Sequence, residues 1–219
     1  MPASTATATQ VYSLAAKTSS ESAERVQAGP IVGVCLLISR GNFMRLSNTL
    51  IPIVLMLMVS ACKTADPMPT VASVDLNRFM GDWYVIANIP TFIETDAYNP
   101  VETYRLNSDG TVATTFAFNQ GGFSGERKEY NPKGFVVEDT GNAVWGMQFI
   151  WPIKADYRVV YLDDKYERTI IGRNARDYVW VMARTPQISD ADYEALIAVV
   201  ESLGYDLEKI RKSPHRLAD

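Results

Sequence analysis

The sequence predicts an all-β fold in which eight antiparallel strands close into an up-and-down barrel, with one C-terminal α-helix packed outside. Three observations lead to this prediction. Short segments alternate apolar and polar residues, as strands with one buried face do. Tight turns separate these segments, and Asp109-Gly110 is the strongest hairpin signal among them. A single stretch, after Ser189, has the apolar period of an amphipathic helix.

The predicted barrel begins at residues 81–87. Alternation places Trp83, Val85 and Ala87 on one face of a strand. Gly81 has no Cβ, so another backbone or a large ring can approach it closely. Asp75, just upstream, is placed to cap a short helical turn. A short cap that leads into a strand with a buried Trp indicates the start of a closed barrel. The simpler alternative is an ordinary core Trp on an edge strand.

The later strands follow from the same alternation and are bounded by turn residues. The pair Gly121-Gly122 breaks one of them, and Trp151-Pro152 ends another. The predicted segments are 101–106, 111–119, 133–138, 143–151, 157–162, 168–172 and 178–184.

One helix is predicted after the strands. The run Ser189-Asp190-Ala191-Asp192 is a capping signature, and Gly204 is a stop signal. Between them lies an apolar stripe that would face the rest of the fold. It consists of Tyr193, Leu196, Ile197, Val200 and Leu203.

Two blocks of the sequence resemble the lipocalins, in the bacterial branch of that family related to apolipoprotein D. Phe79 followed by Gly81-x-Trp83-Tyr84 is similar to the opening motif of the family. Asp163 to Tyr166, at a tight turn, is a looser match to the second lipocalin block. The resemblance implies eight barrel strands followed by one outer helix.

A third block concerns how the barrel is closed. Arg184, at the end of the eighth strand, matches the third lipocalin block. In the family this Arg stacks across the first-strand Trp and closes the base of the barrel. The resemblance therefore assigns barrel closure to Gly81, Trp83 and Arg184, through a cation–π contact of up to about 2 kcal/mol. Taken alone, Arg184 would be read as a surface residue.

The first 61 residues differ from the remainder in composition. Residues 1–29 are rich in Ala, Ser and Thr and have no sustained apolar period, so no fold is expected there. Residues 50–61 form an apolar run of 12 residues, too short to span a membrane but suited to a signal-peptide core. Met44 is a plausible true start, which would leave residues 1–43 outside the protein.

Cys62 follows small residues at the end of this run. The arrangement resembles the bacterial lipobox, in which the Cys is acylated and becomes the mature N-terminus. A plain secretory signal with an incidental Cys is the alternative. We expect residues 62–73 to be a lipidated tether and residues 74–219 to form the lipocalin domain. By resemblance to enterobacterial lipoproteins, Lys63 favours the outer membrane of a Gram-negative bacterium, with the domain facing the periplasm.

Charge excludes one class of partner. Residues 1–61 carry a net charge of +2, so the remaining 158 residues carry −6, against −4 for the whole chain. An acidic domain argues against nucleic acid as a partner, and attachment to the membrane is expected through the lipid anchor. With Cys62 acylated, residues 63–219 contain no Cys, so the domain is expected to fold without disulfides.

A closed eight-stranded barrel leaves room for one small ligand. The aromatic residues expected to line it are Tyr104, Phe116, Phe118, Trp145, Phe149 and Trp151. Aromatic walls suit an apolar ligand, although the same side chains could simply fill a core. About 14 buried methylenes contribute about 11 kcal/mol, against an association cost of about 4–15 kcal/mol. The ligand class implied by the resemblance, fatty acids and lysophospholipids, agrees with this estimate. A role in envelope maintenance under stress is a further hypothesis.

An enzyme is the alternative. The single histidine, His215, lies in a Lys/Arg/Pro-containing tail, and residues 63–219 offer no Cys nucleophile, metal-ligand cluster or phosphate loop. No cofactor or metal is therefore expected. A lipocalin-fold enzyme acting on a lipid through a carboxylate or Tyr remains open, as do a structural envelope lipoprotein without ligand and a homodimer.

Overall fold

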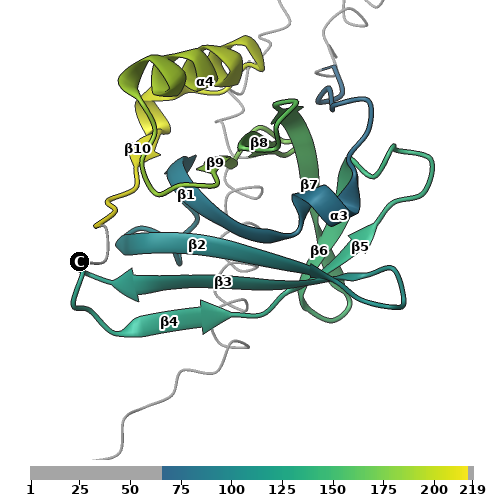
Figure 1. The fold of residues 1–219 in the computed structure, drawn as a ribbon, viewed down its shortest axis with the longest axis horizontal. Helices are drawn as coiled ribbons and strands as arrows, with labels where there is room; N and C mark the ends of the chain where they lie inside the picture. Colours follow the sequence, from purple (N-terminus) through teal and green to yellow (C-terminus); the bar gives the residue numbers. More distant parts are fainter. Residues whose placement is uncertain (1–65, 217–219) are drawn as a thin grey trace, which may run out of the picture. The chain divides into compact units, whose positions relative to one another are not determined.

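Antiparallel pairing joins neighbouring strands into a ring (Figure 1). The computed structural model describes residues 66–216. The strands of the ring pair in the order β1-β2-β3-β5-β6-β7-β8-β9, and the ring closes where β1 pairs with β9, from Tyr84 opposite Ala183 to Ile89 opposite Val179. The strands are β1 (Gly81–Ile89), β2 (Ala97–Leu106), β3 (Val112–Gln120), β4 (Arg127–Tyr130), β5 (Lys133–Val136), β6 (Val144–Ile150), β7 (Ile153–Leu162), β8 (Arg168–Gly172), β9 (Val179–Ala183) and β10 (Arg211–Lys212).

The ring has eight strand positions. β4 and β5 both pair with β3 and share one position, while β10 pairs only with β1 and adds no position to the ring. Pro132 separates β4 from β5, because it has no N–H to donate to a ladder. The predicted closed eight-stranded antiparallel barrel is confirmed. The sequence analysis missed the short strand β4.

Strand direction defines two ends of the barrel. At one end, called the floor, lie the turns 107–111, 137–143 and 163–167 and the short helix α3 (Leu76–Phe79). At the other end, called the mouth, lie the connections 90–96, 121–126, 151–152 and 173–178. The Asp-Gly turn is at the floor, where Gly110 has a φ of +78°, a conformation that favours glycine.

Helix α4 (Asp190–Ser202) packs outside the ring, as predicted. The Ser189 side chain accepts a hydrogen bond from the Asp192 N–H and caps its first turn. Leu196 and Val200 are its buried residues. They join a core cluster between helix and barrel that is separate from the one inside the ring; its barrel members are Ala87, Ile89, Ile170, Val179 and Val181.

The segments before β1 and after α4 both lie against the barrel. Before β1, the Met68 N–H donates to Asn174 Oδ1 at the mouth (2.9 Å), and the Val74 N–H donates to the Gly141 carbonyl at the floor (2.8 Å). After α4, the 3₁₀ turn η1 (Leu207–Lys209) leads into β10, which pairs with the mouth half of β1. The sequence analysis did not predict this strand.

Candidate functional site

The floor of the barrel is built around Arg184. Its guanidinium carbon lies 3.8 Å from the centroid of the Trp83 ring. Its N–H groups also donate hydrogen bonds of 2.7–3.2 Å to five backbone carbonyls. These carbonyls belong to Arg78, Phe79, Met80, Asp82 and Tyr166. One side chain thus ties α3, β1 and the β7–β8 turn together.

Gly81 is placed where only glycine fits without strain. Its φ is +95°, and a Cβ there would lie 3.4 Å from Nη1 of Arg184. The absent side chain leaves space for the guanidinium beside Trp83, whose indole N–H donates to the Phe79 carbonyl (2.8 Å). Gly81, Trp83 and Arg184 are therefore brought together at the floor.

Above the floor, the lower half of the barrel is filled by packed aromatic rings. Phe79 lies 5.0 Å from Trp83 and 5.5 Å from Trp145, centroid to centroid. Trp145 stacks on Tyr157 at 5.1 Å, and Tyr104 meets Trp145 edge-on at 5.7 Å. All five side chains are at most 5% exposed. This half of the interior is a solid core.

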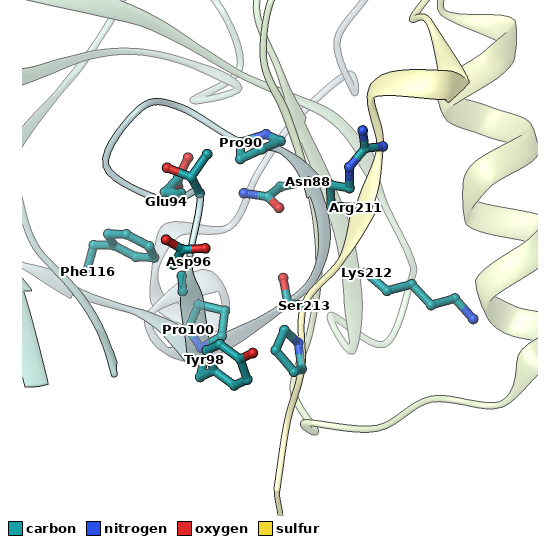
Figure 2. Close-up of a pocket in the computed structure, with 13 residues that line it drawn as sticks. Asn88, Pro90, Glu94, Asp96, Tyr98, Pro100, Phe116, Arg211, Lys212 and Ser213 are labelled. Atoms are coloured by element: carbon teal, nitrogen blue, oxygen red, sulfur yellow. The ribbon is translucent and has the colours of Figure 1, made fainter. Parts of the chain in front are cut away.

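A cavity of about 300 Å³ lies in the mouth half (Figure 2). It sits between the end of β1, the β1–β2 connection, the start of β2 and the segment around β10. Its volume is at the low end of the range of about 300–1,000 Å³ found for small-molecule sites. The lining residues are Asn88, Pro90, Glu94, Thr95, Asp96, Ala97, Tyr98, Pro100, Phe116, Arg211, Lys212, Ser213 and Pro214.

Two basic residues line this cavity without directing their charges into it. The Arg211 guanidinium donates to the carbonyls of Glu208 and Ile210. The Lys212 ammonium lies 4.0 Å from the ring centroid of Tyr193 on α4, and Figure 2 shows its side chain extending toward the helix. Their backbone and inner carbon atoms therefore form the wall.

A buried carboxyl lies directly below the cavity. Phe116 and Pro100 line the cavity. Glu102 is opposite Phe116 in the β2–β3 ladder and two residues along β2 from Pro100. It is hydrogen-bonded to the Tyr104 hydroxyl, which lies 2.7 Å from the Tyr157 hydroxyl. Burial, and secondarily the charge of Glu94, raise the pKa of Glu102 to about 8. Glu102 is therefore mostly protonated at neutral pH.

A second buried carboxyl holds the β1–β2 connection over the mouth. Glu94 accepts hydrogen bonds from the Trp180 indole N–H (2.8 Å) and from the Thr91 N–H (2.7 Å). Burial raises its pKa, and these two hydrogen bonds oppose the increase. Because Trp180 belongs to β9 and Glu94 to the loop, the first bond fastens the loop across the barrel end.

Residues 74–215 match the lipocalin-like domain family. The chain belongs to this family. The match spans α3, every strand of the barrel and helix α4, so it covers both the floor and the cavity described above. The predicted family is thus confirmed.

Similar lipocalins come from plants and bacteria. Temperature-induced lipocalin-1 of Arabidopsis thaliana is 31% identical over 67% of this chain and 82% of its own length. Outer membrane lipoprotein Blc of Escherichia coli (strain K12) is 29% identical over 69% of this chain and 87% of its own length. Among solved structures, insecticyanin from the tobacco hornworm Manduca sexta superposes with a TM-score of 0.55, 15% identity and coverage of 71% of this chain and 86% of its own. That likeness concerns the fold alone.

Of the six aromatic residues predicted to line the lipocalin interior, Phe116 reaches the cavity. Tyr104, Phe118 and Trp145 are at most 1% exposed and belong to the packed core. Phe149 is partly buried against the same core. These positions agree with the alternative in which the aromatic side chains fill a core.

Trp151 is placed differently from the prediction. The strand expected over residues 143–151 ends at Ile150, and Trp151 lies in the turn to β7 with 81% of its surface exposed. Alternation extended one residue too far assigned it to an interior wall, whereas the following Pro152 makes the chain turn there. Trp151 is therefore a rim residue of the mouth.

Sequence reasoning missed Glu94 and Glu102, because Glu is almost never fully buried without a partner. One signal was available for Glu102, which has the same strand phase as Tyr104, a predicted interior residue. Glu94 lies in the loop that covers the mouth and fastens it, whereas the neighbouring apolar residue Phe92 is 49% exposed.

Other predicted features fall partly outside the described residues. Cys62, the expected lipidation site, and the signal segment lie in residues 1–65, which the structure does not describe. Within residues 66–216, no group of three or more His, Cys, Asp or Glu is arranged to hold a metal ion. In the same residues, no helix has the length and apolar character needed to cross a membrane. His215 lies in the C-terminal segment, with Nε2 2.8 Å from the Val85 carbonyl.

Proposed function

We propose that this lipocalin binds one single-chain lipid, a fatty acid or a lysophospholipid, in the mouth half of its barrel. The observation that carries the proposal is the cavity of about 300 Å³ under the fastened β1–β2 connection. Its small volume favours one acyl chain over two. Pro90, Pro100 and Phe116 supply apolar surface to it.

The energetics support a lipid over a small polar metabolite. Each buried methylene contributes about 0.8 kcal/mol, so an acyl chain can offset an association cost of about 4–15 kcal/mol. A polar ligand would need several positioned hydrogen-bonding groups. In this cavity the Arg211 and Lys212 charges are directed elsewhere, and Glu94 is already engaged by two donors. The other polar side chains of the lining are assigned to the head group of the lipid; they belong to Asn88, Thr95, Asp96, Tyr98 and Ser213.

We place the protein at the periplasmic face of the outer membrane, anchored through an acylated Cys62. Two features support this placement: small residues precede Cys62 at the end of an apolar run, and similar proteins are named outer membrane lipoprotein Blc. Storage or transport of lipids during envelope stress is the corresponding cellular role. A homodimer is compatible with this role.

Displacement binding tests the function. Delipidated protein is mixed with the fluorescent fatty acid cis-parinaric acid, and lysophospholipid is added as competitor. We expect saturable one-to-one uptake, loss of the signal on competition, and recovery of both lipids unchanged by mass spectrometry. Absence of uptake would contradict lipid binding, and steady turnover of the lysophospholipid would favour the enzyme alternative.

A matched pair of variants locates the site. Ala97→Trp places a large side chain at a cavity-lining position, whereas Ala113→Trp adds the same side chain to β3 at a position outside the cavity lining. We expect Ala97→Trp to weaken binding at least tenfold and Ala113→Trp to leave it within twofold of the unmodified protein. Equal affinities in the two variants would place the ligand elsewhere.

A further inference from the structure

Strands β1 and β2 separate before they reach the mouth. Their pairing runs from Gly81 opposite Tyr104 to Tyr84 opposite Val101 and then stops. β1 nevertheless continues to Ile89, and β2 begins as early as Ala97. The mouth half of the barrel wall is therefore interrupted between these two strands. We call this interruption the seam.

The C-terminal segment, residues 211–216, fills the seam. On one side it pairs with β1, with Lys212 opposite Ala87 and Arg211 opposite Asn88. The Ser213 N–H also donates to the Ile86 carbonyl (2.9 Å). His215 adds a side-chain bond on the same side, since the Val85 carbonyl can only accept and Nε2 must donate.

On its other side the same segment is bonded to β2. The Asn99 N–H donates to the Pro214 carbonyl (2.9 Å), and the Arg216 N–H donates to Asn99 Oδ1 (2.8 Å). Asn99 has a φ of +48°, and the β2–β3 register shifts between Tyr98 and Val101. The start of β2 is thus distorted at the point where it meets the segment.

The segment is also a wall of the cavity. Four consecutive residues, 211–214, line it. Figure 2 shows Arg211 and Ser213 on the side of the cavity away from Phe116. Displacement of these residues would open the cavity sideways, through the seam, with the rest of the ring still paired. Both residues of β10 are exposed, and this short segment is held by the hydrogen bonds given above and by contacts of Lys212 with Tyr193 and of Arg216 with Phe123. Such segments open at a fraction of the free energy of global unfolding.

The mouth itself is more firmly covered. Glu94, whose carboxyl fastens the β1–β2 connection, is 7% exposed and accepts hydrogen bonds from both Trp180 and Thr91. Opening that route would break the buried hydrogen bond between Glu94 and the Trp180 indole and displace the whole β1–β2 connection. Detachment of the C-terminal segment exposes backbone groups that water can satisfy.

We propose that the seam between β1 and β2 is the portal through which a single lipid chain enters and leaves, and that residues 211–216 are its gate. This inference rests on the proposed function. A lateral portal lets an acyl chain slide in along its length, while the floor and the β1–β9 closure stay intact.

A reversible cross-link tests the gate. Ala87 and Lys212 are directly opposite, and such antiparallel pairs have Cα separations of about 4.5–5.5 Å, within the range of disulfides. Ala87 packs under α4 and Lys212 extends toward Tyr193, so the link would lie outside the cavity. The double variant Ala87→Cys/Lys212→Cys is made with Cys35 and Cys62 changed to Ser.

The control variant carries an engineered disulfide between two strands away from the seam. Arg105 and Ala113 are opposite each other between β2 and β3, near the floor. The variant Arg105→Cys/Ala113→Cys therefore ties two strands that the proposal leaves in place. Association and dissociation of cis-parinaric acid are followed by stopped flow, with each variant oxidised and then reduced.

We expect oxidation to slow both rates at least tenfold in the gate variant and to leave both unchanged in the control. The affinity in the gate variant should change little, because the link raises a barrier without altering the bound or free end state. Equal rates in the oxidised and reduced gate variant would overturn the portal alone. Absence of binding in the unmodified protein would overturn the proposed function, and the portal with it.

A second variant does not depend on cross-linking. Ser213→Pro removes the N–H that donates to the Ile86 carbonyl and weakens the pairing with β1. We expect cis-parinaric acid to dissociate at least fivefold faster from this variant, with an unchanged unfolding midpoint for the barrel. Dissociation that is unchanged or slower would contradict the gate.

Discussion

Arg184 stabilises the floor through hydrogen bonds as well as through its contact with Trp83. Sequence reasoning assigned it the ring contact, which is 3.8 Å in the structure. The backbone carbonyls that it satisfies, among them Asp82 at 2.7 Å and Arg78 at 2.8 Å, were not foreseen, because no sequence pattern reports which carbonyls are left unpaired.

Arg184→Ala is expected to lower the free energy of unfolding by about 2–4 kcal/mol, because it removes the hydrogen bonds to the floor carbonyls and the contact with the Trp83 ring. Arg184→Lys should lose less stability than Arg184→Ala, because Lys keeps the positive charge. It should still be less stable than the unmodified protein, because Lys lacks the planar set of N–H donors. Urea denaturation measures both. Arg105→Ala, at an exposed position of β2, is the control and should stay within about 0.5 kcal/mol of the unmodified protein. A similarly small loss for Arg184→Ala would contradict this role.

Glu102 makes the free energy of unfolding of the barrel depend on pH. Its pKa is about 8 in the folded protein, against an ordinary 4.5. Between these values the folded state keeps a proton that the unfolded state has released, so stability falls as pH rises, on the order of 1 kcal/mol per pH unit. Glu102→Gln removes this contribution. We expect the variant to gain stability relative to the unmodified protein from pH 5 to pH 8 in urea titrations; parallel curves would contradict the assignment.

At the scale of single elements, the β1–β2 connection is the part most sensitive to one bond. Trp180→Phe removes the indole donor to Glu94 and keeps a smaller aromatic ring in its place. We expect amide hydrogen exchange over residues 91–97 to accelerate at least fivefold, because the loop then opens more easily. Trp151→Phe, an exposed change in the neighbouring mouth turn, is the control and should leave that exchange unchanged. Equal exchange in the two variants would show that the fastening is unimportant.

Elements with strong local signals were predicted, and those defined by distant partners were not. Ser189 and Gly204 bound α4 through local capping, and Asp109-Gly110 set its hairpin. β4 and β10 are short and polar and exist because β3 and β1 offer edges to pair with. Segments of four and two residues are too short to show the alternation of apolar and polar residues that indicates a strand.

At the scale of the whole molecule, ligand binding should be visible as stability. A lipid at 100 times its dissociation constant adds about 2.7 kcal/mol to a protein that binds only when folded. For a domain of this size, that corresponds to a rise in melting temperature of about 5–11 °C. Thermal scans with and without fatty acid measure it, and Ala97→Trp should show a smaller rise at the same lipid concentration. An unchanged midpoint for the unmodified protein would contradict binding.

The barrel could be predicted as a whole, but the division of its interior could not. Alternation shows which residues share a face of a strand but not which face points inward; Tyr104 and Trp145 lie on the buried faces. Whether inward residues enclose space or touch one another depends on packing across the ring. Here Phe79 from α3 fills the lower half, and the cavity remains where β1 and β2 separate.

The path of the chain before β1 determines which end of the barrel would face the membrane to which Cys62 is proposed to be anchored. Met68 is hydrogen-bonded at the mouth, and the chain then travels to the floor. If Cys62 carries an acyl group, the five residue steps from Cys62 to Pro67 span at most about 18 Å when fully extended. Because Met68 is held at the mouth, so short a linker would keep the mouth and the seam near the bilayer surface. A chain passing from membrane to cavity would then cross little open water.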